Sequence, residues 1–568
     1  MISLNLKNIT EKTGKNLSEI AREIGVNRNT IQSFASGKAG GIRFSTLEKL
    51  MKTFGLSLND LLVSQIEEKK FQDILPKHIY RQEAEAVPFT LIFPVQWAAQ
   101  VPSPDGRWPS FFGNIHFYSR DQYSEAFLDE ANMRASASGM LKLLSKPVEF
   151  DTVWQKFLKG SKQLEEIYYR LFDFNPQTLG TVQIISLHKE ISQAYEIFWR
   201  SSIFIDAFDI GIDQEEINLL IKKYNLTKED SEVLTTPTEK IFSQEKLFEF
   251  LKLVQRYSEK NFDQVTLAEH LIKDHAFQSF RKKFDAAGSN YAVVNHITAE
   301  ETAAEIIKTL TDQNLWREQI INLAFYEKTR RSLIKNILVK RHLATNPLWV
   351  FERLTFFREA RKKYNLMGIH ALDILLSAIE RLTGIPKKYL QHLLPDEVEL
   401  VLRGRIGLEE LKRRREEGVM YVLRFDGSIS LIYGSQAESI KKDLEGRMGI
   451  GESLNTLSGQ TACQGYAKGV ARVILDVSQF DRFHEGEILV TGMTRPEFVP
   501  LMKKAAGIVT NEGGITCHAA IVSRELGVPC IIGTKVATKV IPDGAWIEVR
   551  ANHGTIRILE NEGDKKDT

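Results

Sequence analysis

The sequence predicts a multidomain α+β protein with a small all-α domain, a large mainly α-helical middle and a C-terminal β/β/α domain. Three observations support this fold class. A chain of 568 residues is too long for one hydrophobic core and is expected to form roughly three or four folded units. Helical hydrophobic periods dominate residues 146–420, whereas short strand-like runs separated by Gly, Pro and Asp occupy residues 459–560. The expected segments are therefore 1–65, 66–145, 146–445, 446–560 and a charged tail, 561–568.

The composition limits the functions that the chain can have. With 43% hydrophobic residues, 26% charged residues and a net charge of +2, any affinity for nucleic acid has to come from a small part of the surface. The three cysteines form no close pair of the kind found in disulfide frameworks or zinc knuckles. The N-terminus lacks the pattern of a signal peptide, and no apolar run approaches the ~18 residues that span a bilayer. We therefore expect a cytoplasmic protein with reduced thiols and no membrane partner.

Short amphipathic helices with tight turns are expected in residues 1–65. LSEIAREIGV places Leu17, Ile20 and Ile24 on one face and stops at Gly25. NRNTIQSFASGK predicts a second short helix, and FSTLEKLMKTFG predicts a third. This pattern resembles the Cro/C1-type (Xre-like) helix-turn-helix domain, whose second helix presents polar residues to the major groove of DNA.

The resemblance implies double-stranded DNA as a partner. The residues expected to contact base edges or phosphates are Asn27, Arg28, Asn29, Thr30, Gln32, Lys38 and Arg43. Residues 1–62 hold nine Lys or Arg against five Asp or Glu, which favours this interpretation. The alternative is a helical protein-interaction module of the same shape. Because a single domain of this type binds DNA weakly, a homodimer on a two-fold operator is a further hypothesis.

Residues 66–145 are predicted to form a mixed α/β segment of unknown role. FTLIFPVQWAAQ and FFGNIHFYS are rich in aromatic and β-branched residues, and PSPDGRWPS separates them with turn residues. We therefore expect a few strands here. Much further along the chain, VMYVLRFDGSISLIYG predicts a β-hairpin with Asp426 and Gly427 in its turn.

The middle of the chain is predicted to be mainly helical, as in WQKFLKGSKQLEEIYYRLF and EKLFEFLKLVQRYSEK. Its basic residues Arg358, Arg361 and Lys362 are candidates to approach a phosphate, but a charged helix face is the favoured interpretation. Three histidines follow no metal-ligand spacing and are assigned no role: His296, His342 and His370. The sequence therefore predicts no metal site.

The segment TNEGGITCHAAIVSRELG carries the clearest chemistry of the chain. After an apolar strand, Gly513 and Gly514 allow a tight turn, and Thr516 is expected to cap the helix that follows. His518 then lies in the first helical turn, beside unpaired backbone N–H groups and the positive end of the helix dipole. A phosphoryl group would find donors there, and imidazole is largely unprotonated near neutral pH. The alternative is a helix-capping or half-buried histidine without chemistry.

The surroundings of His518 resemble the phosphohistidine (mobile, or swivelling) domain of the phosphoenolpyruvate-utilising enzymes. That family includes phosphoenolpyruvate synthase, pyruvate phosphate dikinase and the rifampin phosphotransferases. Its signature is a Thr, two glycines, then Thr-Ser-His followed by Ala-Ala-Ile-Val and Arg-Glu. The residues in matching places are Thr510, Gly513, Gly514, Thr516, Cys517, His518, Ala519, Ala520, Ile521, Val522, Arg524 and Glu525. The flanking segments GQTACQGYAKGVARVI, EILVTGMTRPEFVPLMKKAAGIVT and GVPCIIGT extend the likeness to about 100 residues.

The resemblance implies that His518 is phosphorylated in a reaction cycle and that Thr516, Gly513 and Gly514 shape its loop. Arg524 is expected either to help neutralise phosphate or to be a solvated helix arginine. The segment FREARKKYNLMGIHALDILLSAIERLTG resembles the helical linker that precedes this domain in phosphoenolpyruvate synthase-like proteins.

Two departures from the family pattern affect the expected function. Cys517 stands where the family has serine, which removes a hydroxyl donor beside the histidine. The chain also shows no Gly-rich nucleotide loop and no alternating strand–helix run long enough for a barrel of ~250 residues. We therefore expect no cofactor bound by the chain itself. Phosphate from phosphoenolpyruvate or ATP, with magnesium, is expected in trans from partner proteins that carry ATP-grasp or phosphoenolpyruvate-binding domains.

The favoured hypothesis is a DNA-binding regulator or accessory phosphotransfer protein that carries phosphate on His518. A second hypothesis is a phosphotransferase component that acts with separate nucleotide- and acceptor-binding subunits. A third is a transcription repressor whose swivelling domain is catalytically silent. The intact loop argues against the third, because a silent domain has no chemical need for His518.

Overall fold

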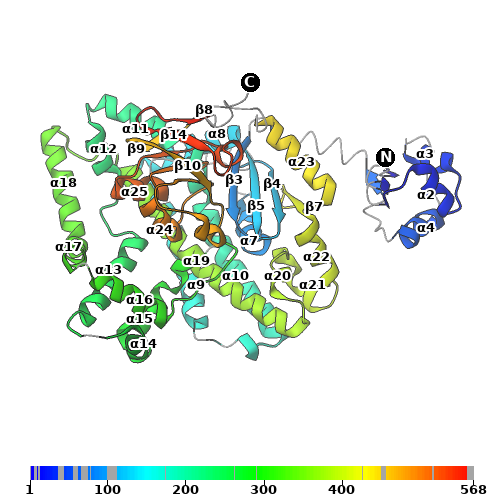
Figure 1. The fold of residues 1–568 in the computed structure, drawn as a ribbon, viewed down its shortest axis with the longest axis horizontal. Coiled ribbons are helices and arrows are strands. Elements are labelled where there is room, and N and C mark those ends of the chain that lie inside the picture. Colours follow the sequence, from blue (N-terminus) through cyan, green and yellow to red (C-terminus); the bar gives the residue numbers. More distant parts are fainter. Residues whose placement is uncertain are drawn as a thin grey trace, which may run out of the picture. The chain divides into compact units, whose positions relative to one another are not determined.

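The computed structural model describes residues 2–4, 9–10, 13–35, 44–54, 62–64, 75–76, 79–98, 112–172, 174, 176–210, 212–260, 262–289, 291–311, 313–424, 426–448, 456–513 and 517–559. The chain divides into two compact units, Met1–Lys77 and His78–Thr568 (Figure 1). Within the described residues, no helix combines the length and the apolar character that crossing a membrane requires. The three cysteines are free thiols, as expected.

The first unit is built on three helices, α2 (Leu17–Glu23), α3 (Arg28–Ala35) and α4 (Phe44–Phe54). A short antiparallel pair, β1 (Ile2–Leu4) with β2 (Leu62–Ser64), brings its two ends together. The Asn16 side chain accepts hydrogen bonds from the backbone N–H groups of Ser18 and Glu19 and so caps α2. Buried apolar residues from these helices and the segments beside them form the core, namely Ile9, Ile20, Ala21, Ile24, Ile31 and Leu50. The three helices predicted for this part of the chain are confirmed.

The second unit contains a five-stranded antiparallel sheet whose strands come from two distant parts of the sequence. Its order is β3 (Ile79–Glu85), β5 (Tyr123–Asp129), β4 (Ile115–Arg120), β6 (Val419–Leu423) and β7 (Ile429–Tyr433). Strands β6 and β7 form the predicted hairpin. In its turn, Asp426 accepts a hydrogen bond from the Ser428 N–H (2.8 Å), and Gly427 adopts φ = 83°, which favours glycine.

One predicted strand is wrong. Residues 89–98 of FTLIFPVQWAAQ lie in the helix α7 (Pro88–Ala98), which starts with a proline at its first position. Phe89 and Ile92 of this helix are fully buried. A short segment that is apolar all round shows no helical period, so its pattern cannot distinguish a buried helix from a buried strand. The strand expected in FFGNIHFYS is confirmed as β4.

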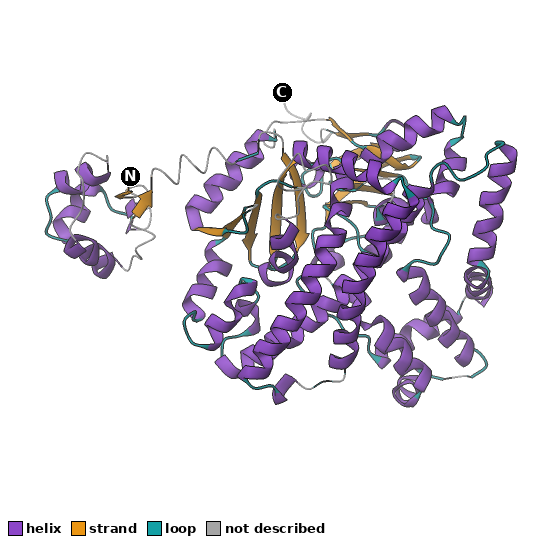
Figure 2. Ribbon diagram, turned by 180° about the vertical axis from the view of Figure 1, so that it is seen from behind, coloured by secondary structure: helices purple, strands orange, loops and turns teal. Residues whose placement is uncertain are grey.

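Helices make up most of the second unit, as predicted (Figure 2). The longest is α19 (Trp349–Thr383), whose 35 residues span about 50 Å. It packs against α9 (Pro147–Leu171) and α10 (Thr181–Ser202), and the three helices share one hydrophobic core with the five-stranded sheet. The remaining helices before the last sheet are α8 (Glu130–Leu144), α11 (Ile212–Lys223), α12 (Lys228–Thr235), α13 (Phe242–Tyr257), α14 (Gln264–Lys273), α15 (His275–Phe284), α16 (Ala299–Leu310), α17 (Gln313–Ala324), α18 (Tyr326–Lys340), α20 (Lys387–Leu390), α21 (Val398–Leu402), α22 (Leu408–Glu417) and α23 (Gly434–Arg447).

The close packing of α9 on α10 depends on Gly160. A Cβ at this position would lie 2.5 Å from the backbone nitrogen of Phe198, and backbone cannot move aside cheaply. We therefore expect Gly160→Ala to lower the free energy of unfolding by about 1–3 kcal/mol. Gly139→Ala in α8 is the matched control, because a Cβ there meets nothing within 4 Å. That variant should be neutral or more stable by about 0.5–1 kcal/mol. Calorimetric melting of both variants checks the prediction, and equal transition temperatures would contradict it.

The last part of the chain forms an eight-stranded sheet. Its order is β8 (Thr456–Ser458), β15 (Thr555–Ile558), β14 (Trp546–Arg550), β10 (Tyr466–Val473), β11 (Ile488–Thr491), β12 (Gly507–Thr510), β13 (Cys530–Ile532) and β9 (Gln460–Cys463). Strands β10 to β13 are parallel, and α24 (Val499–Lys504), α25 (His518–Leu526) and α26 (Ala537–Val540) accompany them. The carboxyl ends of β11 and β12 are therefore neighbours, and ligands commonly bind at such an edge. The predicted β/β/α architecture is confirmed.

Candidate active site

His518 is the first residue of α25, which follows β12 through a loop that contains Gly513. Gly513 adopts φ = 115°, and a Cβ there would lie 2.6 Å from Cys517 Sγ, so glycine is required. The N-cap of α25 is Cys517, one residue later than the cap expected at Thr516. The other predicted loop residues, Gly514 and Thr516, lie outside the described part of the chain. His518 therefore lies at the positive end of the α25 dipole.

A threonine hydroxyl orients the imidazole of His518. Thr494 Oγ1 lies 2.9 Å from His518 Nδ1, and Thr494 itself is almost fully buried in the loop that follows β11. When Nδ1 donates its hydrogen to this hydroxyl, the free lone pair of the ring is on Nε2. In that tautomer, Nε2 is the nitrogen that is available to attack phosphorus.

The ring of His518 is held in its neutral form. Burial, and next the positive charge of Lys362, lower the pKa of His518 well below its usual value. An imidazole in this state keeps its lone pair at neutral pH and below, which a nucleophile requires.

His518 lines a cavity of about 250 Å³. The walls come from the five-stranded sheet, from α10 and the turn after it, from α19, and from the two loops that follow β11 and β12. One side of the cavity is apolar and includes Leu91, Phe112, Ile115, Phe117 and Leu128. Concave sites with an apolar wall and a few convergent polar groups are typical binding sites for small molecules.

Charged side chains of both signs gather on the other side of this cavity. The basic residues are Arg358, Arg361, Lys362 and Arg495, and the acidic residues are Asp206, Glu359, Glu497 and Glu512. Interpreting the α19 bases as a solvated helix face was therefore wrong. They are half-buried and line the same cavity as His518, because α19 runs through the interior of the unit and not along its surface.

Some of these charges are paired. Arg361 forms an ion pair with Asp206 and lies over the ring of Trp199, which sets the direction of its guanidinium. Arg495 Nη1 lies 3.9 Å from Glu497 Oε1. No described residue donates a hydrogen bond to that buried carboxylate oxygen. Glu497 is therefore suited to accept a hydrogen bond from a hydroxyl group in the cavity.

Ion pairs join the segment that follows β13 to α8 and to β5 of the five-stranded sheet. Lys535 Nζ lies 3.2 Å from Glu130 Oε2, and Lys539 Nζ lies 3.5 Å from Glu125 Oε1. The first pair is partly exposed and contributes little to stability, whereas Glu125 is buried.

Arg524 is half-buried and contacts β9. Its Nε donates a hydrogen bond to the Ala462 carbonyl (3.0 Å) and so joins α25 to β9, and it does not line the cavity.

Sequence reasoning missed three residues of the cavity, Thr494, Arg495 and Glu497. The available signal was their position directly after the carboxyl end of a predicted strand, inside the segment EILVTGMTRPEFVPLMKKAAGIVT.

The predicted DNA-contacting residues lie at the start of α3. Asn27, Arg28, Asn29, Thr30 and Gln32 are all exposed. Asn27 Oδ1 accepts a hydrogen bond from the Asn29 N–H (2.8 Å), so part of this side chain caps its own helix. Lys38 and Arg43 fall outside the residues that the structure describes.

Two family models match the chain. Residues 483–554, which include His518, match the mobile domain of PEP-utilising enzymes. Residues 5–65 match the Cro/C1-type helix-turn-helix DNA-binding domain. Both resemblances inferred from sequence motifs are confirmed.

The curated relatives are similar to the chain over a limited segment. A probable phosphoenolpyruvate synthase of Archaeoglobus fulgidus is 47% identical over 130 residues, which are 23% of this chain and 16% of the relative. The phosphoenolpyruvate synthase of Pyrococcus furiosus is 44% identical over 142 residues, 25% of this chain and 16% of the relative. That of Aquifex aeolicus is 56% identical over 88 residues, 16% of this chain and 10% of the relative. The matched segment thus spans about one sixth of these relatives or less.

Proposed function

We propose that His518 carries a phosphoryl group between a donor and a small molecule bound in the adjacent cavity, and that the helix-turn-helix domain couples this state to DNA. One observation carries the proposal: the imidazole, oriented by Thr494, opens into a cavity of about 250 Å³ that the chain itself builds. The donor is phosphoenolpyruvate or ATP, delivered with Mg²⁺ by a partner protein. In this proposal the acceptor site belongs to this chain. From the sequence, both the donor site and the acceptor site were expected on partner proteins, because the chain has no recognisable ATP-grasp or phosphoenolpyruvate-binding domain.

The proposed chemistry is a transfer in two displacements. First, Nε2 attacks the phosphorus of the donor, the bond from phosphorus to the donor oxygen breaks, and a phosphohistidine forms. Next, a hydroxyl oxygen of the bound molecule attacks the same phosphorus and the P–N bond breaks. The hydroxyl proton passes to a cavity carboxylate, for which Glu497 is the best placed. Arg358, Lys362 and Arg495 stabilise charge on the phosphoryl oxygens.

The lining indicates the class of acceptor. Four basic and four acidic residues balance each other, so the cavity favours a molecule of small net charge. The apolar wall formed by Phe112, Phe117 and their neighbours favours a hydrophobic body. A hydroxylated molecule with one apolar side fits both features. A regulator of this kind would respond to that molecule, because phosphorylation of His518 or occupancy of the cavity changes the charge beside α19 and the His518 loop.

The test is transfer of labelled phosphate. The purified chain is incubated with ³²P-labelled phosphoenolpyruvate or ATP, Mg²⁺ and a cell lysate that supplies the donor protein. We expect acid-labile label on the protein and its discharge into small molecules extracted from the same lysate. Label on the protein without discharge would favour the role of phosphotransferase component, with an acceptor on another subunit. Absence of label on the protein with both donors would overturn the proposal.

If the helix-turn-helix domain binds DNA as proposed, Arg28→Ala should weaken that binding. Arg28 is exposed at the start of α3, where a recognition helix meets the major groove. On an operator selected from random DNA with the wild-type protein, we expect a loss of about 1–3 kcal/mol in binding, measured by gel shift at fixed salt. Lys52→Ala is the matched control, since it removes one exposed positive charge from α4. Equal losses in both variants would mean that Arg28 makes no specific contact.

A further inference from the structure

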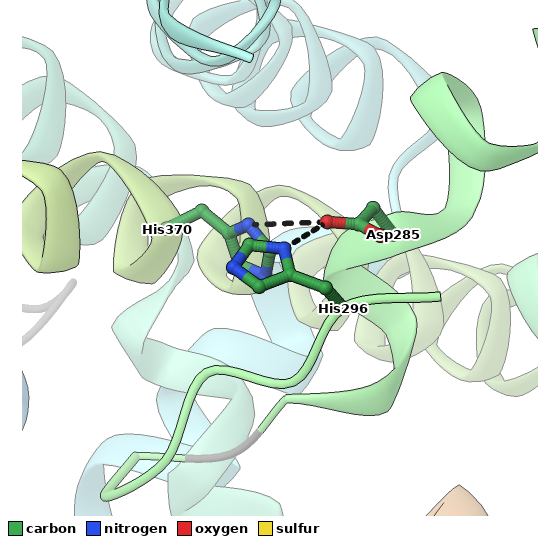
Figure 3. Close-up of side chains that lie close together, drawn as sticks. All are labelled: Asp285, His296 and His370. Atoms are coloured by element: carbon green, nitrogen blue, oxygen red, sulfur yellow. Dashed lines mark hydrogen bonds and ion pairs between the residues drawn. The ribbon is translucent and has the colours of Figure 1, made fainter. Parts of the chain in front are cut away.

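Three side chains of the second unit meet although they are distant in the sequence (Figure 3). Asp285 begins a short turn after α15, His296 belongs to the loop before α16, and His370 lies in the middle of α19. One ligand atom from each lies within 4.8 Å of those from the other two. Asp285 and His370 are buried, whereas the side chain of His296 is 60% exposed. The group therefore has a closed side and a side open to solvent.

The hydrogen bonds around His370 set the direction of its lone pair. Ser289 Oγ donates to the Asn295 carbonyl (3.3 Å) and lies 2.8 Å from His370 Nε2. With the hydroxyl hydrogen used in this way, Nε2 carries the hydrogen of the ring and donates it to Ser289 Oγ. The lone pair is then on Nδ1, which faces Asp285. This arrangement, in which the outer nitrogen is held by a hydrogen bond, is the usual setting of a metal-binding histidine.

The gap between His370 and Asp285 favours a cation. His370 Nδ1 lies 3.9 Å from Asp285 Oδ2, too far for a hydrogen bond, and both atoms are acceptors in this protonation state. His296 Nδ1 donates a hydrogen bond to the same oxygen (2.6 Å), and the Ile297 N–H donates to Asp285 Oδ1 (2.7 Å), so a bound ion would replace the first of these bonds. Among the described residues, no Lys or Arg forms an ion pair with the buried carboxylate of Asp285.

We propose that Asp285, His296 and His370 bind one divalent transition-metal ion, for which Zn²⁺ is the best fit. Two imidazoles and a carboxylate are ligands that Zn²⁺ accepts, at about 2.0–2.2 Å. In tetrahedral geometry two such ligand atoms lie about 3.3 Å apart. The observed distances of 2.6 and 3.9 Å lie on either side of that value. A small movement of the exposed His296 ring completes the site, and water from the open side takes the fourth position.

The ion would fix one wall of the cavity near His518. The segment between Asp285 and His296 carries Ser289 and Tyr291, and both line that cavity. On the other side, His370 belongs to the same helix as the cavity bases of α19. The metal would therefore hold this loop to α19. This role does not depend on phosphate transfer, so the site can be tested separately.

The experiment measures metal on the full-length protein. After removal of any affinity tag and treatment with EDTA, the protein is incubated with Zn²⁺, desalted and analysed by inductively coupled plasma mass spectrometry. Variants are His296→Ala, which changes an exposed side chain, and Asp285→Asn, which keeps the shape of the buried one. His275→Ala is the matched control, because it removes an exposed histidine of α15 outside the group. Circular dichroism confirms that each variant is folded.

We expect about one Zn²⁺ for each chain in the wild-type protein and in His275→Ala. Zn²⁺ affinity should fall about 100-fold or more in His296→Ala and in Asp285→Asn. Co²⁺ substitution should give the intense visible absorption of a four-coordinate site, which both variants lose. If the wild-type protein retains no Zn²⁺, or if His296→Ala retains as much as His275→Ala, the proposal is wrong.

Discussion

Replacing His518 with alanine is expected to remove the acid-labile phosphate label from the protein, a loss of about 10³-fold or more. The physical reason is that Nε2 of His518 is the atom proposed to form the bond to phosphorus. Thr494 occupies the other ring nitrogen, and a hydroxyl or carboxylate nearby would give an ester that survives acid differently. The measurement is label per chain after gel filtration, with and without acid treatment.

His484→Ala is the matched control for this experiment. His484 belongs to the same domain and is exposed, and its hydrogen bonds with Glu487 are made by its backbone N–H and carbonyl. This variant should label like the wild-type protein. If His518→Ala retains its label, or if His484→Ala loses it equally, His518 is not the phosphate acceptor.

Replacing Lys362 with methionine should give the second largest effect. Lys362 lines the cavity with His518, and its charge contributes to the low pKa of the imidazole. Removal of one cation that stabilises a transferring phosphoryl group costs about 10²–10³-fold in rate. We therefore expect label transfer to slow by about 10²-fold. Lys363→Met is the control, because this neighbouring lysine pairs with Glu165 (3.2 Å) and does not line the cavity.

The same variant should change the pH dependence. In the wild-type protein the pKa of His518 is low, so the ring stays neutral as the pH falls, and the rate should hold below the usual histidine value of about 6.5. Without the positive charge of Lys362, the imidazolium form is less disfavoured and the pKa rises. The rate of Lys362→Met should therefore begin to fall at a higher pH. The profile of initial labelling rate between pH 5 and 8 checks this, and superimposable profiles would contradict it.

Elements that form through interactions between neighbouring residues were predicted correctly from the sequence, whereas elements that depend on distant residues were not. The α2, α3 and α4 helices, the hairpin at Asp426 and Gly427, and the helices of the middle were predictable, because caps, turns and periods act over a few residues. The α7 segment was not, because its sequence is apolar almost throughout and so has no polar face to reveal a helical period. The pairing of β4 with β6 also left no signal, since the two strands are separated by almost all of the middle region.

The His518 cavity and the group of Asp285, His296 and His370 were also not predictable, because both depend on contacts between distant residues. The bases of α19 have the pattern of any charged helix, and only the packing of that helix through the interior places them beside His518. His296 and His370 match no ligand spacing, so the sequence predicted no metal site there. Their approach to Asp285 results from how the loop before α16 folds onto α19.

By itself, the sequence determined the loop of His518 and the two terminal domains. The loop geometry depends on neighbouring residues: glycine at position 513 because φ is positive, and a helix that starts at His518. Only the tertiary structure decided what His518 faces. The cavity takes its walls from the five-stranded sheet, α10, α19 and the loops that follow β11 and β12, and no local pattern records which distant side chains will share a space of about 250 Å³. The physical reason is that burial in a core is a property of the assembled layers, whereas turns and caps are properties of adjacent residues.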